Sequence, residues 1–183
     1  VDLEVIGNKA YMANYDFGLE IIDIGAEFLP NALVGTYDTA GSAYKSVVVG
    51  STTYLADGTN GLLVFDMTTP STPTLTKIYD TPGAVYGVTI VGNTAYLADD
   101  TGGMQIVNIS TPSTPTLVGT LATTGNSRDI AIAGNTAYVA DRFAGLSIVD
   151  ISYPSTPTRI GVYTTSDKAL GVAVVGNNAY VAT

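Results

Sequence analysis

Three residue types are missing from this chain of 183 residues, which contains no cysteine, no histidine and no tryptophan. Without histidine and cysteine there is neither a Ser-His-Asp triad nor a Cys-His nucleophile pair, so these two forms of nucleophilic catalysis are excluded. Zinc sites built from imidazole or thiolate ligands are excluded for the same reason, and so is a disulfide framework.

Positive charge is scarce, because 7 Lys and Arg residues stand against 16 Asp and Glu residues and leave a net charge of −9. An acidic surface repels phosphate backbones, so nucleic acid is not an expected partner. No apolar run approaches the roughly 20 residues of a membrane helix, so no membrane insertion is expected. The acidity, the few lysines and the many threonines are typical of an exported microbial protein, and the length suits a single region with a sizeable core.

The sequence repeats itself along its whole length. A Gly-x-x-x-Tyr turn recurs at intervals of 43, 42, 42 and 42 residues and begins at Gly7, Gly50, Gly92, Gly134 and Gly176. A Pro-Ser-Thr-Pro segment recurs at residues 70–73, 112–115 and 154–157, whereas the first repeat has only Pro30 in that region. The chain therefore divides into repeats 1–43, 44–85, 86–127 and 128–169 and a partial fifth repeat, 170–183.

Each repeat is predicted to form four short strands, which in the third repeat are residues 88–91, 95–98, 104–109 and 116–121. Val, Ile, Thr and Tyr fill these segments, and Gly, Pro and Asn separate them, which is typical of strands joined by tight turns. The inner strands carry apolar residues on both faces, so we expect sheets that cover one another. Four antiparallel strands every 42 residues indicate the blades of a β-propeller. A β-helix and tandem immunoglobulin-like sandwiches fit the spacing less well.

The third strand of each repeat resembles the signature of the LVIVD-repeat proteins. Residues 145–151 (Gly-Leu-Ser-Ile-Val-Asp-Ile) carry the resemblance, residues 61–66 and 18–23 match it closely, and residues 103–108 depart from it at Asn108. The resemblance covers the whole chain and implies an all-β propeller of the kind found in secreted or cell-surface proteins of bacteria and archaea. It carries no catalytic motif.

The partial fifth repeat bears on closure, because a closed ring needs whole blades, typically four to eight. Residues 170–183 supply two strands of a fifth blade. Three interpretations follow. The chain is part of a longer propeller, or another chain supplies the missing strands, or the repeats form an open array or a small distorted ring.

Two loops per repeat are predicted to share one rim of the blades, and their sequences differ between repeats. Variable loops that contain aromatic residues and arginine indicate a recognition surface. The predicted contact residues are Tyr15, Phe17, Tyr44, Arg128, Arg142 and Phe143. The alternative is that these loops vary because nothing constrains them.

Acidic residues recur at the ends of the second and third strands, in three of the four complete repeats for each strand. Asp57, Asp99 and Asp141 end the second strand and are interpreted as caps that accept backbone N–H groups of the turn that follows. The alternative is a calcium site built from these three carboxylates; no other cofactor is expected. Asp23, Asp66 and Asp150, with Asn108, end the third strand and receive the same capping interpretation.

The sequence favours a binding protein over an enzyme. Asp99 and Asp100 are adjacent on a predicted strand, so they point to opposite faces and do not form the facing carboxylate pair of a glycosidase. We therefore expect a non-enzymatic extracellular or cell-surface scaffold that mediates protein–protein interaction or assembly, with another protein or copies of itself as partner. The alternatives are a calcium- or carbohydrate-binding propeller, or a self-assembling subunit of a ring or filament completed by strand exchange.

Overall fold

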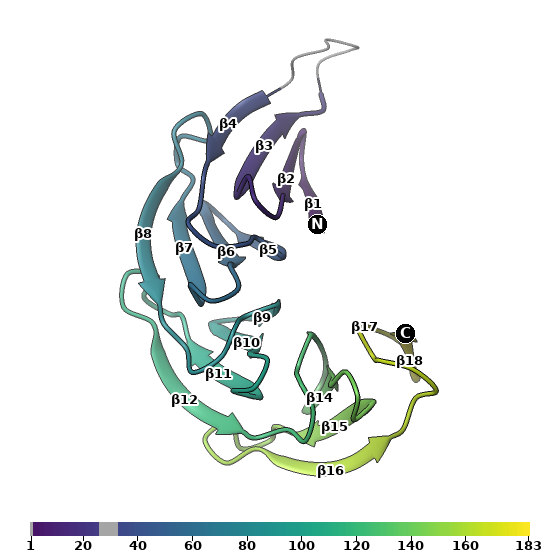
Figure 1. The fold of residues 1–183 in the computed structure, drawn as a ribbon. Helices are drawn as coiled ribbons and strands as arrows, with labels where there is room; N and C mark the ends of the chain where they lie inside the picture. The colour runs from purple at the N-terminus through teal and green to yellow at the C-terminus, as the bar shows by residue number, and fades with distance from the viewer. Residues whose placement is uncertain (1, 26–32) are drawn as a thin grey trace. The chain divides into compact units, whose positions relative to one another are not determined.

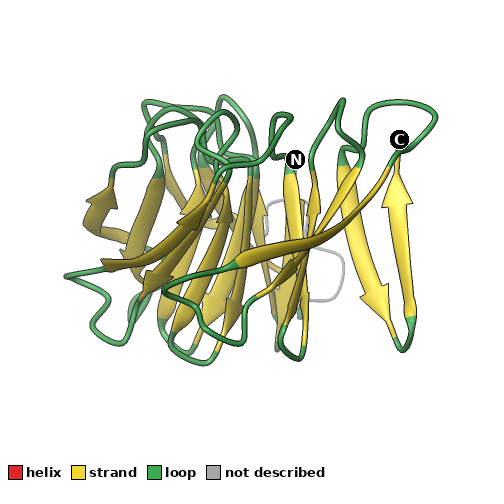
Figure 2. Cartoon of the chain, turned by 90° about the horizontal axis from the view of Figure 1, so that it is seen from below, coloured by secondary structure: helices red, strands yellow, loops and turns green. Residues whose placement is uncertain are grey.

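The computed structural model describes residues 2–25 and 33–183, so Pro30 lies outside the described residues. Every regular element of the described chain is a β-strand (Figure 2). The strands form antiparallel sheets in which consecutive strands pair, and four of the sheets contain four strands (Figure 1). The all-β prediction is confirmed. No helix in the described part of the chain is long and apolar enough to cross a membrane.

The chain divides into two compact units, residues 1–80 and residues 81–183. Unit 1 contains two sheets, formed by the strands β1 (Asp2–Ile6), β2 (Lys9–Ala13), β3 (Leu19–Asp23) and β4 (Leu33–Tyr37), and β5 (Lys45–Val49), β6 (Thr52–Ala56), β7 (Leu62–Asp66) and β8 (Thr74–Tyr79). Unit 2 contains two such sheets and a hairpin, formed by β9 (Gly87–Val91), β10 (Thr94–Ala98), β11 (Met104–Asn108) and β12 (Thr116–Leu121), β13 (Asp129–Ala133), β14 (Thr136–Ala140), β15 (Leu146–Asp150) and β16 (Thr158–Tyr163), and β17 (Gly171–Val175) with β18 (Asn178–Ala182).

The predicted strands of the third repeat match β9 to β12 to within one residue at each end. The first two strands pair up to Val91 and Thr94, which leaves Gly92 and Asn93 as a two-residue hairpin turn. Gly92 has a φ of 57°, a backbone conformation that favours glycine and is required by such turns. The third strand stops at Asn108 rather than at residue 109, because the Asn108 side chain accepts the Ser110 N–H and turns the chain away.

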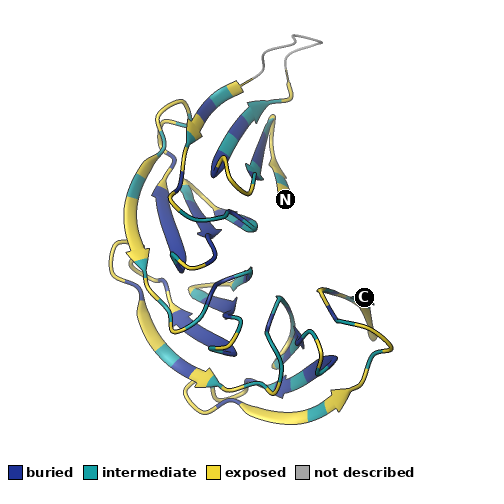
Figure 3. Ribbon diagram, in the orientation of Figure 1, coloured by how far each residue is buried: buried dark blue, intermediate teal, exposed yellow. Residues whose placement is uncertain are grey.

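The fourth strand of each sheet is its outer edge. Strands β8 and β16 are mostly exposed and β12 is half exposed, in contrast to the inner strands (Figure 3). Each pairs with the third strand through a register shift, as between Ile106 and Val107 of β11. The Pro-Ser-Thr-Pro segments directly precede these edge strands, and proline suits an edge because it donates no hydrogen bond to a ladder.

The core of each unit lies between its sheets. In unit 1, Ile21 and Phe65 are fully buried in one cluster. The Tyr37 and Phe65 rings pack edge to face with their centroids 4.8 Å apart. In unit 2, Ile106 of β11 packs in one cluster with Val149 of β15. Burying each such side chain stabilises the fold by about 1.5–3 kcal/mol. The first four residues of β7 and of β11 are all buried, which confirms that the inner strands are covered on both faces.

Carboxylates connect the first strands of neighbouring sheets within each unit. In unit 1, Glu4 accepts the Val48 N–H at 2.6 Å and Asp2 accepts the Ser46 N–H at 3.3 Å. In unit 2, Asp129 accepts the Val172 N–H at 3.0 Å. These bonds satisfy edge N–H groups that have no strand beside them. Burial raises the pKa of Glu4, against the lowering effect of the Val48 hydrogen bond.

The tyrosines that recur once per repeat are packing residues where the next sheet covers them. Tyr11, Tyr54 and Tyr96 are buried, and burial raises the pKa of each phenol. Tyr180, in the hairpin β17–β18, is exposed.

Candidate interaction rim

The loop between the second and third strands has the same backbone in every complete repeat. Its first residue donates its N–H to the carbonyl of the glycine four residues later, at 2.8–3.0 Å; the pairs are Asn14 with Gly18, Asp57 with Gly61, Asp99 with Gly103, and Asp141 with Gly145. Its second residue is left-handed in all four loops; these residues are Tyr15, Gly58, Asp100 and Arg142, with φ of 39°, 56°, 43° and 45°.

This loop pairs with the loop that leads from the fourth strand into the next repeat. Isolated antiparallel bridges join Tyr15 to Ala43, Asp100 to Ser127 and Arg142 to Ala169. Each bridge has two N–H to carbonyl hydrogen bonds of 2.9–3.2 Å. The prediction that the two variable loops share one rim is therefore confirmed for these three pairs. We call these loops the variable rim.

In three of these loops the residue before the left-handed position is a buried aspartate that is bound by the preceding loop, an arrangement we call the carboxylate clasp. Asp57, Asp99 and Asp141 have no exposed surface. The hydroxyl of Thr39 donates to Asp57 at 2.6 Å, and that of Thr81 donates to Asp99 at the same distance. These threonines precede their carboxylates by 18 residues. The clasp therefore joins two loops that are distant in sequence.

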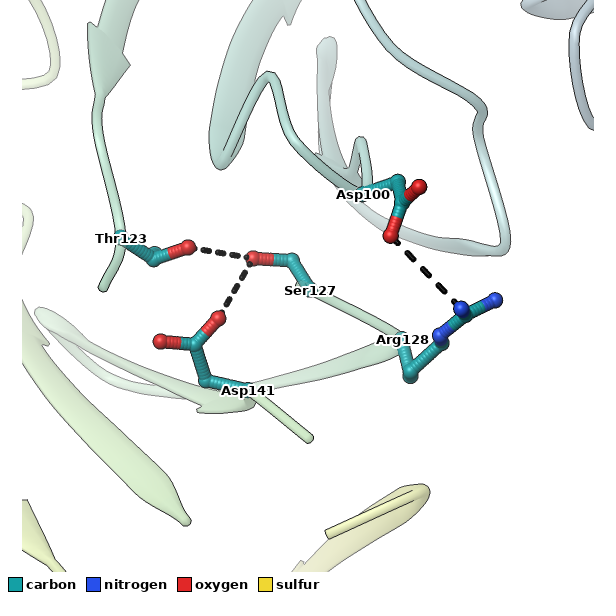
Figure 4. Close-up of polar contacts among 5 residues, drawn as sticks. All are labelled: Asp100, Thr123, Ser127, Arg128 and Asp141. Atoms are coloured by element: carbon teal, nitrogen blue, oxygen red, sulfur yellow. Dashed lines mark hydrogen bonds and ion pairs between the residues drawn. The ribbon is translucent and has the colours of Figure 1, made fainter. Parts of the chain in front are cut away.

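The clasp of Asp141 uses a serine as an intermediate (Figure 4). The Ser127 hydroxyl lies 3.3 Å from Asp141 Oδ1 and 3.0 Å from the Thr123 hydroxyl. The Gly125 N–H donates to Asp141 Oδ2 at 3.0 Å, as the Gly83 N–H donates to Asp99 Oδ2 at 3.2 Å. Both oxygens of Asp99 and of Asp141 thus accept hydrogen bonds from the preceding loop.

These donors differ from the predicted ones. We expected the carboxylates to cap the turn that follows them, and such a local bond is seen only from the Asn60 side chain to Asp57, at 2.8 Å, among the described hydrogen bonds. Sequence reasoning missed the threonines, although Thr39, Thr81 and Thr123 recur with the same 42-residue period. In the first repeat, Asn14 replaces the aspartate and donates to Glu20 at 2.7 Å, so the carboxylate has moved to the third strand.

Burial raises the pKa of Asp99, and the charge of Asp100 raises it further. Hydrogen bonds from the Thr81 hydroxyl, the Gly83 N–H and the Gln105 side chain oppose the effect of burial. Thus the folded state holds this carboxylate in a dry site and compensates it with donors.

The calcium alternative for Asp57, Asp99 and Asp141 requires free carboxylate oxygens, whereas these carboxylates are surrounded by hydrogen-bond donors. Each carboxylate accepts O–H or N–H groups, and these occupy oxygens that a calcium ion requires as ligands. Over residues 2–25 and 33–183, no three Asp, Glu, His or Cys side chains gather as a metal-binding group.

The predicted contact residues of unit 1 form an aromatic group on the variable rim. The Tyr15 and Tyr44 rings pack edge to face with their centroids 5.3 Å apart, and their hydroxyl oxygens lie 3.5 Å apart. Phe17 lies in the same turn as Tyr15 and is 67% exposed.

In unit 2, Arg128 forms a group with two residues that sequence reasoning missed. Its guanidinium lies 3.7 Å from a carboxylate oxygen of Asp100, and both side chains are about one-fifth exposed (Figure 4). The same guanidinium lies 3.8 Å above the Tyr86 ring, a cation–π contact. In the repeat, Asp100 corresponds to Tyr15 and Tyr86 corresponds to Tyr44. This correspondence with two predicted contact residues could have identified them from the sequence.

The other predicted contacts of unit 2, Arg142 and Phe143, lie together. The Arg142 guanidinium is 4.9 Å from the centre of the Phe143 ring, and the Lys168 ammonium is 5.2 Å from the same centre. Phe143 is 67% exposed.

The aspartates that end the third strands are local caps, as predicted. Asp23, Asp66 and Asp150, and Asn108 in their place, each accept the N–H two residues later at 2.8 Å. Asp150 accepts the Ser152 hydroxyl as well, at 2.6 Å.

We expect the effect of the Ser152 cap to be measurable in the pKa of Asp150. The Ser152 hydroxyl and N–H hold the pKa of Asp150 below its ordinary value of 3.8. A lowered folded pKa means that the ionised group stabilises the fold above pH 3.8 and that this contribution is lost as the pH falls through the folded pKa. A ¹³C NMR titration of Asp150 should show its pKa rising towards 3.8 in Ser152→Ala; an unchanged pKa contradicts the assignment.

The chain belongs to the LVIVD repeat family. The family model matches residues 1–39, 40–81, 82–123, 124–165 and 167–183. The first four matches end four residues before the repeats defined above, with the period unchanged. No curated protein matches the chain significantly.

Solved structures of low sequence identity share the fold. The computationally designed Ika8 protein is 11% identical with a TM-score of 0.78, and 98% of this chain matches 54% of it. A functionally unknown protein from Desulfotomaculum acetoxidans DSM 771 is 15% identical with a TM-score of 0.72, covering 90% of this chain and 56% of that one. A chain of the Mitotic Checkpoint Complex is 15% identical with a TM-score of 0.81, covering 98% of this chain and 57% of that one. This chain spans little more than half of each. The predicted fold class, an all-β protein built of four-stranded propeller blades, is confirmed.

Proposed function

We propose that this chain is a non-enzymatic β-propeller scaffold, outside the cell or on the surface of a bacterium or archaeon. Its variable rim binds another protein or further copies of the chain. The family resemblance and the acidic composition support the location. The missing histidine and cysteine support a role in binding rather than in catalysis.

One observation carries this proposal: the rim changes its side chains while it keeps its backbone. The left-handed position of the four loops is occupied by Tyr15, Gly58, Asp100 and Arg142. A left-handed backbone costs on the order of 1 kcal/mol for most side chains and almost nothing for glycine. Because Gly58 already shows that glycine fits, tyrosine and arginine at this position are best explained by what their side chains contact.

The comparisons favour the same class of function. The family description, LVIVD repeat, names no catalytic activity. A chain with the same fold is part of the Mitotic Checkpoint Complex, a multiprotein assembly. That likeness supports a scaffold role for this fold and supplies no partner.

The experiment replaces the rim and leaves the blades intact. A variant that combines Tyr15→Gly, Phe17→Ser, Arg142→Gly and Phe143→Ser should lose cross-linked partners from the surface proteins of the source organism, as measured by mass spectrometry. Light scattering of the chain alone tests copies of itself as the partner. The control variant Lys77→Ser, on an exposed outer strand, should behave as wild type. Identical partners for the rim variant and wild type would refute the proposal.

A further inference from the structure

We propose that Arg142, Phe143, Lys168 and Leu170, which we call the cation–aromatic patch, bind a peptide segment in which a carboxylate side chain stands beside an apolar one. This inference rests on the proposed function and names the partner chemistry of one part of the variable rim.

The patch is assembled by a single bridge of unit 2. Arg142 and Ala169 exchange two backbone hydrogen bonds of 3.0 Å, which places residues 142–143 beside residues 168–170. The Phe143 ring then has the Arg142 guanidinium at 4.9 Å and the Lys168 ammonium at 5.2 Å. Phe143 and Leu170 are 67% and 51% exposed. Two cations and two apolar side chains thus meet the solvent together.

Arg142 has hydrogen-bonding capacity that the described residues do not use. Its Nε is buried without a hydrogen-bond partner among them, and its backbone is left-handed at a position where Gly58 serves in the second repeat. The Nε of Arg128, which follows the bridged residue Ser127, likewise has no hydrogen-bond partner among the described residues, but the Arg128 guanidinium has the Asp100 carboxylate at 3.7 Å. A carboxylate supplied by a partner would give the Arg142 guanidinium the opposite charge that Arg128 finds within the chain.

The charge distribution favours an acidic partner at this location. The chain has a net charge of −9, and three of its 7 basic residues, Arg128, Arg142 and Lys168, lie in rim loops of unit 2. The neighbouring Asp167 carboxylate accepts the Lys168 backbone N–H at 2.7 Å. A local cationic patch on an acidic molecule attracts an acidic segment while the remaining surface repels extended polyanions.

The apolar half of the patch distinguishes a peptide from a polyanion. Phosphate polymers and sulfated sugars gain affinity from many cations, whereas here two cations flank an exposed phenylalanine and leucine. A short peptide offers both a carboxylate for Arg142 and Lys168 and an apolar side chain for Phe143, and exposed aromatic and arginine residues are the usual anchors of protein contacts.

The test uses the 183-residue chain, ¹⁵N-labelled, and the capped heptapeptide Gly-Glu-Leu-Asp-Phe-Glu-Gly as the probe. We expect NMR shift changes centred on residues 142–143 and 168–170. Arg142→Gly, Lys168→Ser and Phe143→Ala should each weaken binding about tenfold, which is a change of about 1.4 kcal/mol. Arg159→Ser, an exposed arginine on β16, should leave binding unchanged. Replacing the acidic residues of the peptide by Gln and Asn should abolish it.

Three outcomes would overturn the inference: no shifts at the patch, equal binding by the patch variants, or tighter binding of oligoglucuronate than of the peptide. Arg142→Gly should keep the thermal stability of wild type, because glycine relieves the left-handed backbone, so lost binding cannot be attributed to unfolding. If the rim variant loses its partners while this peptide does not bind, the proposed function stands and the partner chemistry alone is wrong.

Discussion

Replacing Gly119 by alanine is expected to lower the free energy of unfolding by about 2–3 kcal/mol. Gly119 lies at the register shift between β11 and β12, opposite Ile106. A Cβ at this residue would lie 2.2 Å from the carbonyl oxygen of Pro154 and 3.1 Å from backbone atoms of Ser155. Backbone atoms cannot rotate away as a side chain does, so the Pro-Ser-Thr-Pro segment of the neighbouring sheet has to move.

The repeat supplies a matched control for this prediction. Gly161 occupies the same position one repeat later, opposite Ile148, and a Cβ there would meet only side-chain atoms of Ile148, at 3.6 Å or more. Gly161→Ala should therefore change the unfolding free energy by less than about 0.5 kcal/mol. Urea unfolding followed by circular dichroism measures both variants. Equal losses would show that the strand, rather than the approach of Pro154, requires glycine.

Removing the carboxylate of Asp99 is the second change with a large expected effect. Asp99→Ala leaves the Thr81 hydroxyl and the Gly83 N–H without their acceptor beneath the rim. Orphaned donors of this kind should lower the unfolding free energy by about 2–4 kcal/mol. Asp99→Asn keeps one acceptor oxygen for Thr81 and should lose less.

The pH dependence of stability, compared between wild type and Asp99→Asn, gives a second test of the buried carboxylate. Because burial raises the pKa of Asp99 above its ordinary value of 3.8, the folded state binds a proton more readily than the unfolded state. The contribution of Asp99 to stability should therefore increase as the pH falls from neutrality through its folded pKa towards 3.8. The stability of wild type relative to Asp99→Asn, measured by urea unfolding at several pH values, should rise over this range. A constant difference would contradict the raised pKa.

The period of the sequence made the fold predictable in detail. A glycine turn every 42 residues, as at Gly92, determines where each hairpin closes, and the hairpin determines the register of its strands. Local chemistry of this kind can be read from neighbouring residues. The caps at Asp66 and Asp150 were predictable for the same reason, because each accepts an N–H two residues away.

The clasp was not predictable in the same way. Asp99 and the Thr81 and Gly83 groups that bind it are 16 to 18 residues apart and meet only because β9 and β10 bring two loops to one rim. A buried carboxylate at the end of a strand looks like a local cap in sequence. The recurrence of a threonine with the same period distinguishes the clasp from a local cap. This signal can be interpreted only when the structure shows that the two loops lie together.

The contact residues were predicted as members of one rim and were found in separate groups. Tyr15 lies against Tyr44, and Arg142 lies against Phe143. Arg128 lies against Asp100 and Tyr86, which the prediction left out. Sequence variation showed which loops differ, but the pairing of individual side chains depends on the bridges between loops.

The identical backbone of the rim loops has a consequence for engineering. Residues 15–17 and residues 142–144 follow the same path, with a left-handed first residue and the same closing hydrogen bond, so their side chains can be exchanged while the strands keep their pairing. In the fourth repeat the clasp of Asp141 does not involve the side chains of residues 142–144, and in the first repeat Asn14, which donates to Glu20, takes the place of the aspartate. The loops of these two repeats can therefore be exchanged as cassettes, whereas in the second repeat Asn60 has to be kept because its side chain donates to Asp57. A library of three-residue inserts in the first and fourth repeats would diversify the surface one turn at a time without redesigning the blade that holds it.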